Sequence, residues 1–102
     1  MKKLTITILL VCTSALVLAE NLGRTIHVNR VFSEGASTAG FYPVESLPEC
    51  KWGLMYIDLS TEGGKAIFSL VLTAKTAGHA VIRVDYTKDS SDKCLVTGFH
   101  TQ

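Results

Sequence analysis

The chain has little net charge. Its 102 residues carry ten Lys and Arg against nine Asp and Glu, so the formal net charge is +1 at pH 7. Proteins that bind nucleic acid or an anionic membrane through charge show a basic excess or a basic stripe, and this composition lacks both. We therefore expect no nucleic-acid partner.

The chain also lacks an apolar run long enough to span a bilayer. Leu4–Leu18 is almost unbroken in its hydrophobicity and follows two lysines, but at about 15 residues it is shorter than the roughly 20 that a membrane helix needs. Such a run, with compact residues at Val17 and Ala19, is typical of a secretory signal peptide. We predict cleavage between Ala19 and Glu20 and no membrane anchor; a lipoprotein signal at Cys12 is the alternative.

Removal of residues 1–19 would leave one small domain, residues 20–102. The 102-residue chain less these 19 residues has 83 residues, eight basic and nine acidic side chains, and a net charge near −1. A domain of this size builds a core that stabilises it only marginally. The signal predicts a secreted or periplasmic destination.

Cysteine is scarce, with Cys12, Cys50 and Cys94 the only three. They form no C-x-x-C pair and have no histidine at ligand spacing, so the common zinc and thioredoxin-like motifs are absent. Two cysteines in a small exported domain are typical of a disulfide, and we predict the pair Cys50–Cys94. The loop of about 45 residues that it would close is worth roughly 4 kcal/mol in the chain-entropy model. A metal or redox pair is the alternative.

The remaining pattern predicts five strands and one helix. Ser60 or Thr61 can cap the helix, and Gly78 is placed to end it. Its surface between these ends is apolar on more than one side, which is more than a single contact with a sheet needs. The predicted strands are Thr25–Phe32, Phe41–Val44, Trp52–Leu59, Ala80–Tyr86 and Cys94–Thr101.

The order β-β-β-α-β-β, mainly β with one helix, is that of an OB-fold, a small Greek-key barrel of five strands. We expect this barrel, clamped by one disulfide. An α+β sheet with one covering helix, not closed into a barrel, is the main alternative.

The segment SLVLTAKTAGHAVIRVDY, Ser69 to Tyr86, resembles the B subunits of Shiga-type toxins. In layout, with a signal peptide, one disulfide and a helix before the fourth strand, the chain is also similar to the wider group of AB5 toxin B subunits and to small exported bacterial OB-fold proteins of unassigned function. This resemblance implies a homopentamer that binds host glycans, with five helices lining a central pore. Lys65 stands where the Shiga-type B subunit has a glycan-contacting tryptophan, so no glycan-binding residue is carried over.

The candidate ligand contacts are therefore chosen by residue type alone. Tyr42, Trp52 and Tyr56 could stack on sugars or on a partner chain, although buried core or an interface is the alternative for each. Phe68 and Leu72 are the candidates for an oligomer interface.

No motif predicts chemistry. Gly63-Gly64-Lys65 is not a phosphate loop, because Ala66 follows where Ser or Thr is required. The three histidines His27, His79 and His100 have no ligand spacing, so we expect no metal, no cofactor and no enzymatic activity. Anion capture by the bare start of the helix is the alternative reading of the two glycines.

These observations predict an exported, non-enzymatic binding module of OB-fold type. In its sharper form it is a toxin-B-subunit-like pentamer whose partner is a host glycan or a partner protein subunit. The alternatives are a free-standing periplasmic protein and a small exported inhibitor or envelope-stress protein.

Overall fold

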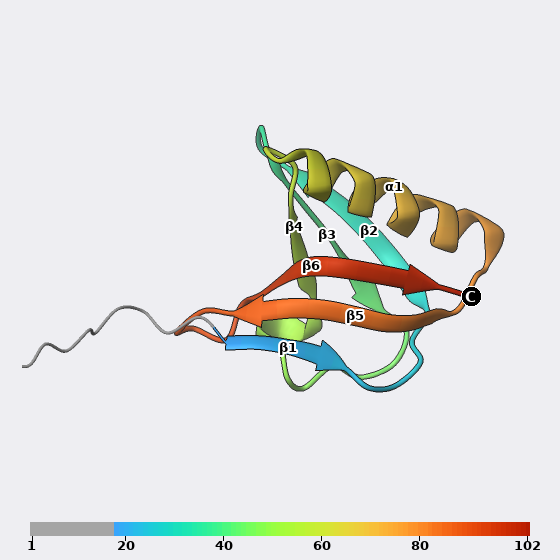
Figure 1. Cartoon of the computed structure of the whole chain (residues 1–102), viewed down its shortest axis with the longest axis horizontal. Helices are drawn as coiled ribbons and strands as arrows, with labels where there is room; N and C mark the ends of the chain where they lie inside the picture. The colour runs from blue at the N-terminus through green and yellow to red at the C-terminus, as the bar shows by residue number, and fades with distance from the viewer. Residues whose placement is uncertain (1–17) are drawn as a thin grey trace, which may run out of the picture.

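The computed structural model describes residues 18–102. The predicted signal over residues 1–19 lies outside this range except for Leu18 and Ala19. Within it, the chain forms one mixed sheet crossed by a single long helix (Figure 1). The elements are β1 (Leu18–Leu22), β2 (Val28–Glu34), β3 (Thr38–Pro43), the short 3-10 helix η1 (Lys51–Gly53), β4 (Met55–Asp58), α1 (Glu62–Ala77), β5 (Val81–Lys88) and β6 (Cys94–Thr101).

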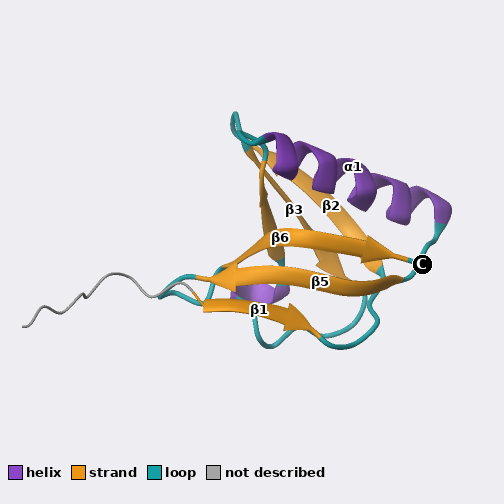
Figure 2. Cartoon of the chain, viewed as in Figure 1, coloured by secondary structure: helices purple, strands orange, loops and turns teal. Residues whose placement is uncertain are grey.

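The six strands have the order β1-β5-β6-β4-β3-β2. Neighbours are antiparallel except β4 and β6, which run parallel and pair only at Met55 with Cys94 and Tyr56 with Leu95. The sheet is therefore strongly bent about this short contact. In Figure 2 the strands β5 and β6 cross in front of β3 and β4, β1 runs alongside β5, and α1 lies over one end.

The fold is mainly β with one helix, as predicted, but the expectation of five strands is wrong. The strand predicted over Thr25–Phe32 does not form as one element: only its part from Val28 onward belongs to β2, which pairs with β3, and Ile26 forms an isolated bridge to Val81. A further strand that was not predicted, β1, pairs with β5. β1 and β2 do not pair with each other, so the sheet is not a closed five-stranded barrel.

The helix begins and ends where its capping residues predict. Thr61 is the N-cap, and its Oγ1 accepts from the backbone N–H of Gly64 at 2.9 Å. Gly78 ends the helix in the left-handed region, at φ 72°. A Cβ on Gly64 would overlap the backbone carbonyl of Asp58. This glycine therefore lets the helix start lie directly against the end of β4, which is a structural role.

The core lies between the helix and the concave side of the sheet. Phe41 and Phe99 meet edge to face at 5.7 Å between ring centroids, and Val71 of α1 packs fully buried beside them in the same cluster. Strict alternation along the predicted strand Ala80–Tyr86 would place Ile82 on the same face as Val84 and Tyr86. Ile82 is exposed instead, because a register shift between Val81 and Arg83 turns Val81 inward.

The predicted disulfide is present and joins Cys50 to Cys94. It connects the residue before η1 to the first residue of β6. The start of the strand predicted over Trp52–Leu59 is wrong, because Lys51–Gly53 forms η1 and the strand begins only at Met55. In the described part of the chain, α1 is too short and too polar to cross a membrane.

Candidate functional site

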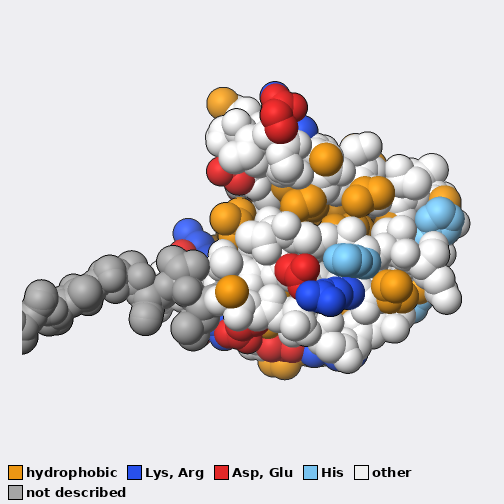
Figure 3. Space-filling view, in the orientation of Figure 1, with side chains coloured by type: hydrophobic (Ala, Val, Ile, Leu, Met, Phe, Trp, Pro, Cys, Tyr) orange, Lys and Arg blue, Asp and Glu red, His pale blue; other side chains and the backbone are white. Residues whose placement is uncertain are grey.

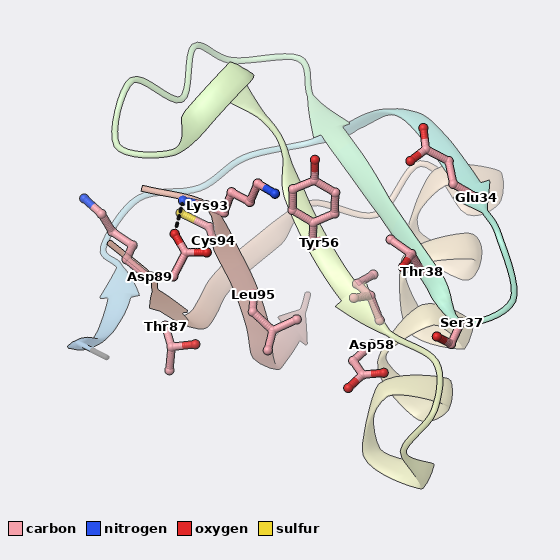
Figure 4. A pocket seen from close by; sticks show the side chains of 12 residues that line it. Glu34, Ser37, Thr38, Tyr56, Asp58, Thr87, Asp89, Lys93, Cys94 and Leu95 are labelled. Atoms are coloured by element: carbon pink, nitrogen blue, oxygen red, sulfur yellow. Dashed lines mark hydrogen bonds between the residues drawn. The ribbon is translucent and has the colours of Figure 1, made fainter. Parts of the chain in front are cut away.

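A groove of about 760 Å³ opens where β4 and β6 separate. Figure 4 shows that its side chains come from both halves of the bent sheet. It is lined by Glu34, Ser37, Thr38, Tyr56, Ile57, Asp58, Thr87, Lys88, Asp89, Lys93, Cys94 and Leu95. Residues far apart in the sequence therefore meet here through strand pairing.

One cross-strand row runs from β2 to β5, and its members Tyr56, Leu95 and Thr87 line the groove. Gly40 of β3 pairs with Phe32 of β2 on one side and with Tyr56 of β4 on the other. Tyr56 in turn pairs with Leu95 of β6, and Leu95 with Thr87 of β5. These side chains share the outer face because paired residues in a sheet point the same way.

The glycine in this row lets the neighbouring rings meet. A Cβ on Gly40 would lie 2.5 Å from Cζ of Phe32, so the Phe32 ring lies over the glycine. There it contacts Tyr56 edge to face, with centroids 6.0 Å apart, and Tyr42 at 5.8 Å. The outer face of β2, β3 and β4 thus carries a row of three aromatic rings.

Trp52 extends this aromatic face from η1. The Lys93 Nζ lies 5.7 Å from the centroid of Trp52 and 5.9 Å from that of Tyr56, so the two rings flank one ammonium group. Lys51 Nζ lies 4.8 Å from the Trp52 ring, and the guanidinium of Arg30 lies 4.6 Å from Tyr42. Cations and rings therefore alternate along this surface.

Two carboxylates on opposite walls of the groove are held in the charged form. Asp58 Oδ1 accepts from the hydroxyl and the N–H of Ser60, and these bonds lower its pKa. Asp89 Oδ1 accepts from the N–H groups of Lys93 and Ser91, which lowers its pKa in the same way. None of the hydrogen bonds within residues 18–102 uses Oδ2 of either carboxylate, so that oxygen can accept from a ligand.

Tyr56 lines the groove between Lys93 and Thr38 and carries a phenolic hydroxyl (Figure 4). Partial burial of the ring, and then the nearby charge of Glu34, raise the pKa of its phenol above the ordinary value. The hydroxyl therefore stays protonated at physiological pH and can both donate and accept.

The structure brings the three predicted ligand contacts to one face. Tyr42 and Tyr56 are connected by Phe32, and Tyr56 and Trp52 by Lys93. Neither Phe32 nor Asp89 was among the predicted ligand contacts. Counting residues outward from the turn between Glu34 and Thr38 would have paired Phe32 with Gly40.

The two interface candidates on α1 differ in position. Phe68 packs against the core of its own chain. Leu72 is 43% exposed, with Leu70 at 42%, and it borders a shallow hollow with Thr73, Thr76 and Ala77. Figure 3 shows hydrophobic side chains between polar ones on the face formed by α1, β5 and β6.

The histidines do not assemble a metal site in the described residues. His27 lies against Glu45, with Nδ1 2.7 Å from Oε2, while His100 is 3.9 Å from Asp85 on the other half of the sheet. No protein-family model, curated protein or solved structure matches the chain. Its function therefore has to be inferred from the groove and the aromatic face themselves.

Proposed function

We propose that this chain is an exported, non-enzymatic binding module that holds a glycan in the groove. The main support is the combination of residues around its floor. Tyr56 and Leu95 offer an apolar surface between the carboxylates Glu34, Asp58 and Asp89, with hydroxyl groups beside them. A sugar needs an apolar surface and hydrogen-bonding groups within reach at the same time.

A pyranose ring fits this combination of groups because its C–H face is apolar and its rim is polar. Its C–H face is apolar and stacks on an aromatic ring, while its hydroxyl groups lie at the rim and need hydrogen-bond partners. Carboxylate oxygens accept such hydrogen bonds more strongly than neutral acceptors do. A sugar stacked on Tyr56 would reach Asp58 on one wall and Asp89 on the other.

The electrostatics of the walls favour binding over glycoside hydrolysis. A glycosidase needs one carboxyl group whose pKa is raised, so that it can donate a proton to the leaving group. Here hydrogen bonds lower the pKa of both Asp58 and Asp89. Both are suited to accepting hydrogen bonds and poorly suited to donating a proton.

We interpret the sheet as an OB-type barrel whose first strand is interrupted. If β1, the Ile26–Val81 bridge and β2 are counted as one strand, five strands remain, with α1 between the third and the fourth. Tyr42 and Tyr56 of the aromatic face then lie on the second and third strands, where OB-folds bind oligosaccharides and oligonucleotides, and Phe32 lies beside them on the first. The open sheet order is compatible with this interpretation because the break falls within one continuous segment.

In its sharper form the proposal includes a homopentamer with α1 at the interface. Leu70 and Leu72 are exposed on the helix, and covering them would remove apolar surface from water. Light scattering of the oxidised mature protein, residues 20–102, tests this. A monomer at micromolar concentration would exclude the pentamer, and Leu72→Glu should dissociate it if it forms.

A glycan array probed with the same protein tests the binding function. Tyr56→Ala should weaken binding of every recognised glycan by about tenfold or more, because it removes the central ring. Tyr56→Phe keeps the ring and should retain most of the affinity, and Ile82→Ala, on exposed β5 surface, should change nothing. Silence across the array, or full binding by Tyr56→Ala, would overturn the proposal and favour the periplasmic or inhibitor roles.

A further inference from the structure

Trp52 has a conformation that the groove alone does not explain. It is the only tryptophan in the chain, its side chain is 61% exposed, and its backbone has φ 61° and ψ 10°. The left-handed region is costly for a bulky residue, and such outliers gather at binding and active sites. We therefore infer that the exposed Trp52 ring contacts a ligand from outside the chain.

Three connections hold this ring beside the groove. The Cys50–Cys94 disulfide lies just before η1, and Gly53 N–H donates to the carbonyl of Cys50 at 3.0 Å. Lys51 N–H donates to the carbonyl of Asp92 at 2.7 Å, in the loop that carries Lys93. The segments that carry Trp52 and Lys93 are thus joined both by the disulfide and by a backbone hydrogen bond.

The two lysines at this ring form no ion pair in the described part of the chain. Among the described residues, neither Lys51 nor Lys93 forms an ion pair, although Arg24, Lys65, Arg83 and Lys88 all do. Of the acidic groups nearby, Asp92 pairs with Lys88 at 3.6 Å. The charges of Lys93 and Lys51 help to lower the pKa of Asp89, after the backbone N–H groups of Lys93 and Ser91, but neither lysine forms an ion pair with it. Two ammonium groups therefore remain available at the exposed ring.

We propose that Trp52 forms a second sugar subsite next to the groove, and that Lys93, between the two rings, selects an oligosaccharide that carries a carboxylate. This inference rests on the proposed glycan binding at Tyr56. The two centroids are no farther apart than the sum of their distances to Lys93 Nζ, a span that a short oligosaccharide covers. One sugar stacks on each ring, and the acidic group lies against the ammonium of Lys93, with Lys51 at the outer side.

The charge distribution favours a sparsely charged acidic sugar over a polyanion. Single-stranded nucleic acid also uses rings and cations, but its phosphates would follow the whole surface. Here the groove that continues from Lys93 is walled by the carboxylates Glu34, Asp58 and Asp89, which repel a phosphate backbone and accept sugar hydroxyls.

The test uses an array that prints acidic oligosaccharides beside their carboxyl methyl esters, which have the same shape without the charge. The oxidised wild-type protein should prefer the acids about tenfold, and Lys93→Gln should lose that preference while still binding the esters. Lys75→Gln is the matched control, since Lys75 also lacks an ion pair within residues 18–102 but lies on α1, and it should behave as wild type.

Trp52→Ala should weaken binding of acids and esters alike by about tenfold, and Trp52→Phe should restore part of it. Unchanged thermal melting and absence of free thiols confirm that these variants are folded. If Tyr56→Ala abolishes binding while Trp52→Ala and Lys93→Gln do not alter it, the groove stands and the second subsite is refuted. Both proposals fail if the Tyr56→Ala variant binds glycans normally or if no glycan binds the wild-type protein. They also fail if oligothymidylate binds more tightly than any glycan.

Discussion

Gly40 and Phe32 lie opposite each other in the β2–β3 ladder, and the ring of Phe32 occupies the space that a side chain at residue 40 would need. The packing of Phe32 against Tyr56 depends on that vacancy. A sheet position with no side chain thus determines how closely the rings of the aromatic face approach one another.

Gly40→Ala should destabilise the protein by about 1–3 kcal/mol, because the new methyl group overpacks against the Phe32 ring and the Met55 carbonyl. Urea denaturation followed by fluorescence measures this. Gly23→Ala is the matched control, since a Cβ at Gly23 has no neighbour within 4 Å, and it should change stability by less than about 1 kcal/mol. Equal effects of the two substitutions would contradict the role of Gly40.

Loss of the disulfide should cost roughly 2–5 kcal/mol of the free energy of unfolding. The double variant Cys50→Ala/Cys94→Ala should therefore unfold at a much lower urea concentration than the oxidised wild type. Reduction of the wild-type protein serves as the control and should lower the midpoint to a similar value. A midpoint unchanged by either treatment would mean that the bond between these residues adds no stability.

Binding of a neutral glycan should resist acid. Hydrogen bonds hold the pKa values of Asp58 and Asp89 below the ordinary 3.8, so both carboxylates are mostly charged at pH 3.8 and above and become protonated as the pH falls through their lowered pKa values. The same sign applies to stability: the hydrogen bonds contribute fully above pH 3.8 and are lost as the pH falls through the folded-state pKa values.

Affinity measured between pH 7 and pH 3 checks this expectation. Asp58→Asn and Asp89→Asn should bind weakly even at pH 7, as the protonated wild type does at low pH, because an amide accepts hydrogen bonds less strongly than a carboxylate. Loss of wild-type binding already above pH 4 would show that these two groups do not control recognition.

Trp52 and its neighbour Gly53 both have positive φ, at 61° and 68°, but only the glycine adopts it without strain. Trp52→Gly should therefore stabilise the fold by about 1 kcal/mol while weakening ligand binding. Gly53→Ala should have the opposite effect on stability, with a loss of about 1 kcal/mol. Thermal unfolding of the two variants tests these opposite stability changes. A Trp52→Gly variant less stable than the wild type would show that the backbone at residue 52 is not strained.

Local signals made some of the fold predictable. Thr61 and Gly78 act through contacts within a few residues, so the helix ends could be read from the sequence, and the last strand, Cys94–Thr101, was predicted with its observed bounds. Ile82 was misassigned because the register shift beside it arises from pairing with β6, which no local pattern records. β1 was missed because Leu18–Leu22 overlaps the end of the predicted signal peptide.

The same distinction holds for the candidate site. Tyr42, Trp52 and Tyr56 could be chosen by residue type, since large aromatic side chains are common ligand contacts. Lys93 and Asp89 are unremarkable members of a polar loop until the parallel pairing of β4 and β6 brings that loop to Tyr56. The sequence contains no signal for that contact, because it joins segments more than a whole helix apart.

The position of the disulfide links the proposed ligand binding at Trp52 to the oxidation of the two cysteines. Cys50 lies two residues before Trp52, and Cys94 directly follows Lys93, so one bond fastens the two segments that flank the proposed second subsite. Such bonds form in oxidising compartments and not in a reducing cytosol. If the proposed second subsite depends on this bond, a chain whose cysteines are still reduced should bind its ligand less tightly than the oxidised chain.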